Sequence, residues 1–169
     1  MKLVVFSDNH RDRKIVQNIL LLNPNADRYI SLGDSEMSEA ELSSMNVFGV
    51  KGNYPFEPKF PYDLMFEFEG WKTLLTHGHR YFVKNGLYTL YQHAEENQCQ
   101  LVLFGHTHQC FVEEKNNILF VNPGSATFPK GSVHPTYAVL SILRDKIDVQ
   151  ILDCITNEIL LSFIKTSKG

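Results

Sequence analysis

The start of the chain has the pattern of a buried strand followed by an amphipathic helix. Residues 2–6 form a continuous apolar, β-branched run, which is typical of a strand buried on both faces. After a polar break, apolar residues recur at helical spacing, at Ile15, Val16, Ile19 and Leu20. The pattern therefore predicts a strand, a loop and a helix in that order.

The next segment repeats this order. Residues 28–32 predict a second strand, which a Gly-Asp-Ser turn ends. Residues 36–44 predict a short helix, with Ser35 as its N-terminal cap because a serine oxygen can accept a bond from a free backbone N–H group. Residues 47–50 predict a third strand.

Later in the chain, strands follow one another. Residues 62–69 alternate between apolar and polar, which predicts a half-buried strand, and a turn at Gly70 joins it to a strand over 72–76. Residues 85–97 carry a helical apolar face and lead into a buried strand over 101–104. Five more strands are predicted at 110–114, 118–121, 137–143, 146–152 and 158–164.

This order of elements indicates the fold class. Strands that alternate with helices early and follow one another late favour an α/β (αββα) architecture, in which two mixed β-sheets pack as a sandwich flanked by helices. No linker or internal repeat divides the chain. We therefore expect a single domain over residues 1–169.

Composition narrows the class of protein. The chain has 169 residues, of which 43% are apolar, and a net charge of −3 with scattered Lys and Arg, so a basic surface for nucleic acid is not expected. No apolar stretch reaches the ~18 residues that span a bilayer, and the apolar start is too short for a signal-peptide core. We therefore expect a cytoplasmic protein without a membrane partner.

The three cysteines do not suggest redox or metal chemistry. Cys99, Cys110 and Cys154 are odd in number, form no Cys-x-x-Cys pair and sit among apolar neighbours. We interpret them as reduced packing residues.

The candidate chemistry lies in loops that directly follow the predicted strands. Taken singly, each polar residue there has an ordinary explanation as a turn residue. Together, carboxylate, carboxamide and imidazole groups from five loops supply what two divalent ions need, with Asp34 placed to bridge them. The candidate metal ligands are Asp8, His10, Asp34, Asn53, His77, His106 and His108.

The order of these residues resembles a known family. Asp8-Asn9-His10, Gly33-Asp34, Gly52-Asn53, His77-Gly78-His79 and Gly105-His106-Thr107-His108 look like the five motifs of the calcineurin-like metallophosphoesterases. The short spacing, Thr76-His77-Gly78-His79 and Asn122-Pro123-Gly124-Ser125 resemble the compact bacterial YfcE/YsnB-type members more narrowly. The resemblance runs from Met1 to about Leu152.

The resemblance implies how the ligands divide between two metals. Asp8, His10, Asp34 and His108 would bind the first ion, and Asp34, Asn53, His77 and His106 the second. It also implies manganese as a frequent metal, and a metal-bridging hydroxide that attacks phosphorus in line. Because His and carboxylate ligands accept several ions, iron, zinc, cobalt, nickel or magnesium stay open.

One motif departs from the family pattern. Relatives commonly carry His or Cys after the Gly-Asn pair, followed by Asp or Glu, whereas this chain has Tyr54-Pro55. That histidine is thought to help the leaving group, so its absence suggests slow chemistry or esters whose leaving group departs without a proton. As candidate catalytic groups we keep Asp34 and Asn53, with His79 as a replacement acid and Tyr54 as a substrate contact.

Several functions stay open at this point. The first is a phosphodiesterase that acts on a small phosphate ester, and a phosphomonoesterase would need only a different pocket. The third is a metal-binding scaffold module, as in the retromer subunit that resembles these enzymes. A homodimer would be the commonest assembly.

Other polar and aromatic residues near the motifs have ordinary structural explanations. We expect His93 and His134 to lie outside the site and Asn122 to Ser125 to be a structural turn. Two alternatives to these explanations are that a nearby cation contacts the phosphate and that aromatic side chains line a substrate pocket. The cations are Arg11, Arg80 and Lys84, and the aromatics are Phe56, Phe60, Tyr62, Tyr81 and Phe82.

Overall fold

The computed structural model describes residues 1–167 and contains eleven strands and three α-helices in that range. The strands of the first sheet are β1 (Lys2–Phe6), β2 (Arg28–Ser31), β3 (Val47–Gly49), β9 (Thr136–Leu143), β10 (Lys146–Asp153) and β11 (Ile159–Thr166). Those of the second are β4 (Asp63–Phe68), β5 (Trp71–Thr76), β6 (Leu101–Leu103), β7 (Cys110–Lys115) and β8 (Ile118–Pro123). The helices are α1 (Arg13–Leu22), α2 (Glu39–Ser44) and α3 (Tyr88–Glu96).

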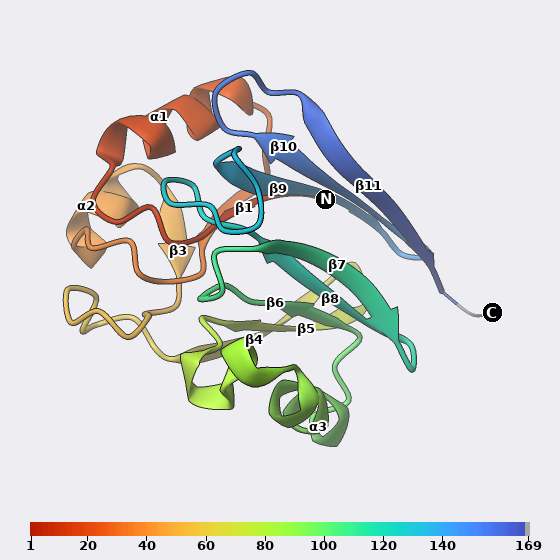
Figure 1. Cartoon of the computed structure of the whole chain (residues 1–169). Helices are drawn as coiled ribbons and strands as arrows, with labels where there is room; N and C mark the ends of the chain where they lie inside the picture. Colours follow the sequence, from red (N-terminus) through yellow and green to blue (C-terminus); the bar gives the residue numbers. More distant parts are fainter. Residues whose placement is uncertain (168–169) are drawn as a thin grey trace.

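The two sheets pack face to face, and helices cover their outer faces (Figure 1). The strand orders are β11-β10-β9-β1-β2-β3 and β4-β5-β6-β8-β7. Helices α1 and α2 pack on the first sheet, and α3 packs on the second (Figure 1). The predicted αββα sandwich of two mixed sheets is therefore confirmed.

Strand β1 shows why the central strands are apolar at every position. Leu3 and Val5 belong to the core between the sheets, whereas Val4 and Phe6 belong to the core under α1 and α2. Successive side chains of a strand point to opposite faces, so a strand covered on both sides needs apolar residues throughout. Strand β6 follows the same rule in the other sheet.

Parallel pairing brings the motif loops to one edge of the sandwich. Strands β1, β2 and β3 run parallel in the first sheet, and β5, β6 and β8 run parallel in the second. Each of these strands ends directly before a motif loop, so the loops gather at the carboxyl ends, where open α/β sheets bind ligands.

The predicted start of the second helix was wrong. Helix α2 begins at Glu39 rather than residue 36, and its cap is Ser38, which forms a capping box with Glu41, rather than Ser35. The reason is local: Glu36 has a φ of 58°, which a right-handed helix cannot accept.

The third helix is also shorter than predicted. Helix α3 begins at Tyr88, and two 3₁₀ turns, His79–Tyr81 and Val83–Asn85, precede it. Gly86, with a φ of 117°, separates these turns from the helix. The remaining element boundaries agree with the prediction to within about two residues, as is usual for strand and helix ends.

Within residues 1–167, no helix is both long enough and apolar enough to cross a membrane.

A buried ion pair joins the edges of the two sheets. Lys165 of β11 is only 3% exposed, and its Nζ donates to Glu114 Oε1 of β7 at 2.6 Å. Glu114 is more accessible, with 30% of its side chain exposed. Removing the carboxylate would leave a buried ammonium group without its partner.

We predict that Glu114→Ala lowers the free energy of unfolding by about 2 kcal/mol, less than for a fully buried pair because Glu114 is partly exposed. Lys165→Met, which removes the buried charge itself, should cost less than Glu114→Ala. Urea denaturation of both variants measures this. Equal losses in the two variants would contradict the explanation.

Candidate metal centre

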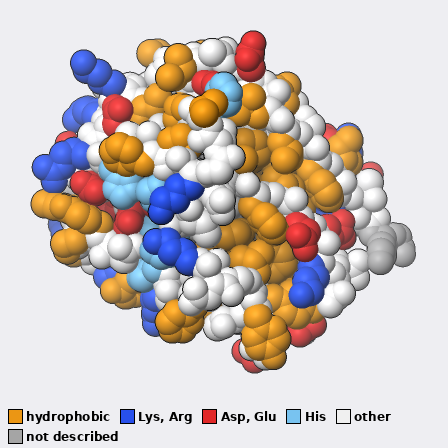
Figure 2. All heavy atoms as spheres, viewed as in Figure 1, with side chains coloured by type: hydrophobic (Ala, Val, Ile, Leu, Met, Phe, Trp, Pro, Cys, Tyr) orange, Lys and Arg blue, Asp and Glu red, His pale blue; other side chains and the backbone are white. Residues whose placement is uncertain are grey.

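Six of the seven predicted ligands form two adjoining clusters at the carboxyl edge of the sheets. One cluster consists of Asp8, His10 and His108, and the other consists of Asp34, His77 and His106, with the ligand atoms of each cluster within 4.8 Å of one another. The seventh ligand, Asn53, joins the second cluster, since its Oδ1 lies 3.2 Å from His77 Nε2. Figure 2 shows histidine and acidic side chains side by side on this face.

The two clusters form one continuous site. His77 Nε2 lies 3.5 Å from Asp34 Oδ2 and 3.8 Å from Asp8 Oδ1, so this imidazole contacts the carboxylates of both clusters. In the first cluster, His108 Nε2 lies 3.2 Å from Asp8 Oδ1 and 3.4 Å from His10 Nε2.

The hydrogen bonds on the far side of three histidines determine which nitrogen faces the site. The Nδ1 atoms of His10, His77 and His108 contact Glu36 Oε1 at 2.7 Å, Leu32 O at 2.7 Å and Phe128 O at 2.8 Å. A carboxylate and a carbonyl can only accept, so each Nδ1 carries the proton and donates it. In the neutral ring, Nε2 then presents a lone pair to the site.

Acceptor atoms therefore face one another with no donor between them. The Nε2 lone pairs of His10 and His108 meet near Asp8 Oδ1, a buried oxygen that has no hydrogen-bond partner. Buried acceptors of this kind are costly unless a cation or a proton lies between them. The residues present thus fit divalent metal ions, with outward Nδ1–H groups bonded as metal-ligating histidines usually are.

Backbone strain coincides with the ligand positions. A positive φ occurs at Asp8 (54°), His10 (41°), Asp34 (48°), His106 (69°) and His108 (61°). Each such conformation costs about 1–3 kcal/mol in a residue other than glycine and persists only where the surroundings enforce it. Their concentration in the motif loops indicates a site rather than ordinary turns.

Neighbouring donors fix the carboxylates. Asp8 Oδ2 accepts bonds from Ser7 Oγ at 2.6 Å and from the backbone N–H of His106 at 3.1 Å, and Asp34 Oδ1 accepts one from the backbone N–H of Tyr54 at 2.9 Å. The other oxygen of each carboxylate therefore points toward the histidines.

Two glycines allow the loops to approach this closely. A Cβ atom at Gly52 would collide with the Asp34 carboxylate, and one at Gly105 would collide with the Ser7 hydroxyl. The glycine in each of these motifs is thus required by the space next to a ligand loop.

The turn at Asn122 to Ser125 holds the ligand loops in place. The Asn122 amide donates to Gly105 O at 2.9 Å, and Ser125 Oγ donates to Asp8 O at 2.8 Å. Gly124 has a φ of 78°. The predicted structural role of this turn is confirmed.

Charge inside the site shifts its pKa values. Burial opposes ionisation of Asp8, but protonation of the neighbouring His108 and His77 rings and the bond from Ser7 outweigh burial and lower the pKa of Asp8. Burial also opposes ionisation of Asp34, yet protonation of the neighbouring His77 ring and the bond from the Tyr54 N–H group lower the pKa of Asp34 well below its ordinary value. Burial and the nearby His77 lower the pKa of His106 to about 4, which keeps this ring neutral and able to bind metal.

Sequence reasoning missed two carboxylates that support the site. Glu36 orients His10, and Glu57, only 1% exposed, accepts bonds from the backbone N–H groups of Ser35 at 2.5 Å and Gly52 at 3.2 Å. Glu57 thereby ties the Asp34 loop to the Asn53 loop. Its position in the Pro-rich segment after Tyr54 gave no periodic signal.

The two candidate catalytic groups outside the ligand set lie beside the second cluster. The His79 ring centre is 5.4 Å from that of His77, and its buried Nδ1 has no hydrogen-bond partner. Tyr54 is 37% exposed and stacks on Phe56 at 5.2 Å. Both residues line a hollow of about 390 Å³ that also includes Asn53 and Tyr62.

The remaining histidines and cations lie elsewhere or have other contacts. His134 bonds to Asp153 at 2.6 Å, and the His93 ring lies 4.9 Å from that of Tyr81, so neither histidine belongs to the clusters, as expected. The Arg11 guanidinium lies over the Phe56 ring at 4.7 Å, and that of Arg80 over Tyr62 at 4.6 Å.

The cysteines have the expected packing role. All three are free, and Cys99 and Cys154 are buried. Burial raises the pKa of both thiols, which keeps them protonated and unreactive.

Residues 1–145 match the family model of the calcineurin-like phosphoesterase superfamily domain, and the chain belongs to this family. It is similar to the probable metallophosphoesterase YsnB of Bacillus subtilis, with 32% identity over 94% of this chain and 95% of YsnB. It is also similar to the phosphodiesterase YfcE of Escherichia coli K12, with 36% identity over 41% of this chain and 34% of YfcE.

Solved structures show the same fold. A conserved protein of Streptococcus pneumoniae TIGR4, described as a predicted phosphoesterase, superposes with a TM-score of 0.88 and 29% identity over 98% of this chain and 97% of its own. Vacuolar Protein Sorting 29 from Cryptosporidium parvum superposes with a TM-score of 0.80 and 20% identity over 98% of both chains. The second likeness shows the fold alone.

We predict a pH-dependent stability that depends on Glu57. Burial and the charge of Asp34 raise the pKa of Glu57 to about 7, above its ordinary value of 4.5, so the folded protein binds this proton more tightly than the unfolded chain does. The stabilisation of the folded protein by this proton is therefore complete below pH ~4.5 and is lost as pH rises through ~7. This changes the free energy of unfolding by roughly 3 kcal/mol.

Glu57→Gln should remove this part of the pH dependence, because an amide does not titrate in this pH range. Urea denaturation of metal-free protein between pH 5 and pH 8 measures the difference between variant and parent. Parallel stability curves for the two proteins would contradict the assignment.

Proposed function

We propose that this protein is a phosphodiesterase that hydrolyses small phosphate esters by in-line attack of water activated between two divalent metal ions. The observation that carries the proposal is the set of facing Nε2 lone pairs and carboxylate oxygens described above. Membership of the phosphoesterase family supports the reaction class. The cytoplasm is the location we expect for it.

Each ion has a proposed ligand set. Asp8, His10, Asp34 and His108 would hold the first, and Asp34, Asn53, His77 and His106 the second, so that Asp34 bridges them. When bound, two such ions lower the pKa of water and neutralise charge on the phosphoryl oxygens. Manganese suits the mixed imidazole and oxygen ligands, as do several other divalent ions.

The residues of this chain orient the ester. The Asn53 side chain is a neutral ligand, which limits the negative charge that faces an anionic substrate. His79 borders the same hollow, so we propose it as the group nearest a leaving oxygen, with Tyr54 as a contact for the ester group.

A diester is favoured over a monoester by two observations. The relative YfcE is named a phosphodiesterase. In addition, two separate hollows border the ligand loops, one at Asn53 and one at Thr107, and a diester has two alcohol groups to place.

We predict that manganese restores diesterase activity to metal-stripped protein and that Asp34→Asn lowers it at least about 100-fold, because loss of a ligand should exceed the ~10–100-fold loss seen for residues that only support a ligand. Asp148→Asn, a half-buried carboxylate that pairs with Lys146 on β10, is the matched control and should keep full activity. Turnover of bis(4-nitrophenyl) phosphate and metal content by mass spectrometry are the measurements.

The scaffold module is the second candidate. It is favoured by Tyr54 in place of the family histidine and by the fold shared with Vacuolar Protein Sorting 29. Tight metal binding without turnover of either a diester or the matching monoester would select it over the enzyme.

We predict that Tyr54→His speeds the hydrolysis of esters with alkyl leaving groups at least about tenfold, because an imidazole could then donate a proton to a poor leaving group. Esters with 4-nitrophenyl leaving groups should change little, since that group departs without a proton. Parallel kcat measurements on both ester types test this, with Tyr54→Phe as the control. An equal gain on both types would argue against acid assistance.

A further inference from the structure

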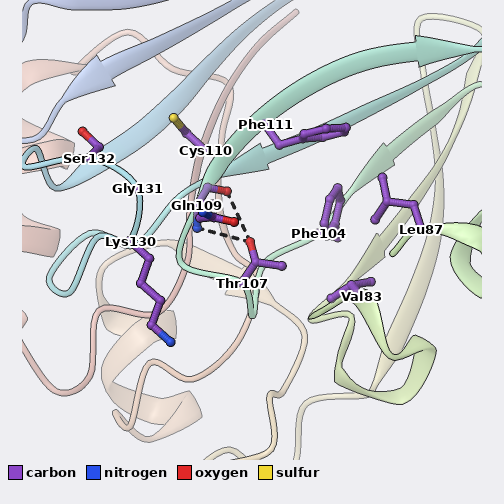
Figure 3. Close-up of a pocket in the computed structure, with 10 residues that line it drawn as sticks. All are labelled: Val83, Leu87, Phe104, Thr107, Gln109, Cys110, Phe111, Lys130, Gly131 and Ser132. Carbon is purple, nitrogen blue, oxygen red and sulfur yellow. Dashed lines mark hydrogen bonds between the residues drawn. The ribbon is translucent and has the colours of Figure 1, made fainter. Parts of the chain in front are cut away.

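A hollow of about 350 Å³ opens beside the loop that carries His106 and His108 (Figure 3). Thr107, which lies between these two histidines, forms part of its wall. Figure 3 shows Thr107 and Gln109 in the middle, four apolar side chains on one side and Lys130 on the other. We call this hollow the Phe104 pocket.

The apolar side of the Phe104 pocket is built from separate elements. Val83 comes from a 3₁₀ turn, Leu87 directly precedes α3, Phe104 directly follows β6, and Phe111 comes from β7. Phe104 and Phe111 meet edge to face with ring centres 6.2 Å apart. Leu87 and Phe111 are partly exposed and form the accessible apolar wall, while Val83 and Phe104 are buried behind them. A concave apolar wall with an aromatic ring favours a planar aromatic ligand, and the volume lies within the ~300–1,000 Å³ range of small-molecule sites.

Positive charge lies between this pocket and the metal centre. Lys130 lines the pocket, and its backbone N–H donates to His108 O at 2.9 Å, so it links the pocket to the loop of the first cluster. Lys84 belongs to the same 3₁₀ turn as Val83. In Figure 2, Lys or Arg side chains border the histidines, and hydrophobic side chains gather beyond them. A ligand that spans both regions would carry an anionic group at the metal centre and an apolar group in the pocket.

We propose that the Phe104 pocket binds an aromatic alcohol portion of the substrate, an aryl ring or a nucleobase, while the phosphate lies at the metal centre near Lys130. This assignment rests on the proposed function. The Gln109 amide, one of the polar groups of the pocket, has both a donor and an acceptor for the edge of a base. A small polyol ester would gain nothing from the apolar wall.

The experiment titrates manganese-loaded protein with naphthylmethylphosphonate and methylphosphonate, whose P–C bonds cannot be hydrolysed. The affinity for methylphosphonate measures binding at the metal centre alone. The ratio of the two affinities measures what the Phe104 pocket adds. We expect the naphthyl compound to bind at least about tenfold more tightly. Leu87→Ala should reduce this ratio about fivefold or more, and Leu87→Met should restore most of it.

Further variants separate the charge from the apolar wall. Lys130→Gln should weaken the binding of both phosphonates by the same factor of about three, because it removes an exposed cation near the phosphate. Tyr88→Ala, next to Leu87 but outside this pocket, is the matched control and should change neither affinity. Ser132→Trp fills the pocket without removing a core side chain, so it tests the proposal even if Leu87→Ala fails to fold.

The outcomes are distinct. Equal affinities for the two phosphonates would overturn the proposal that the pocket binds an aromatic group and leave the proposed function intact. The same holds if neither Leu87→Ala nor Ser132→Trp changes the ratio of the two affinities. Failure of both phosphonates to bind would overturn the proposed function and the pocket together.

Discussion

Three imidazole lone pairs and two carboxylate oxygens face one another at the carboxyl edge of the sandwich, and the surrounding structure keeps them there. Acceptors at 3.2 to 3.9 Å repel unless a cation lies among them. The arrangement is stable in the protein because each outward nitrogen donates to a fixed acceptor, such as Leu32 O behind His77. These bonds orient the candidate ligand atoms toward one another.

The rest of the fold stabilises the backbone strain of these loops. Five ligand residues adopt a positive φ, and two glycines leave room where a Cβ would collide with a neighbouring loop. The hydrogen bonds from Asn122, Ser125 and Glu57 connect loops of different strands, so the strain is distributed over a rigid edge. Such strain, concentrated at a cation site, agrees with the phosphoesterase family to which the chain belongs.

The two hollows beside the candidate metal centre differ in the side chains that line them. One hollow, at Asn53 and His79, is bordered by exposed tyrosines, whereas the Phe104 pocket has an apolar wall and includes Lys130. If the proposed phosphate site lies between them, two unlike hollows suit an ester with two unlike alcohol groups. The ligand set sets the reaction class, and these hollows would decide which ester is chosen.

The sequence by itself determined the sandwich, the order of the strands along the chain and the seven candidate ligand positions. Apolar periodicity marks strands such as β1, and the ordered motifs carry residue types that suit a shared metal site. The sequence could not determine the start of α2 or the roles of Glu36 and Glu57, because a left-handed φ at Glu36 and the contact of Glu57 with Ser35 and Gly52 depend on loops distant in the chain. The tertiary structure alone decided which nitrogen of each histidine faces the site and where the hollows lie, since both depend on neighbours that pack from the other sheet and from separate loops.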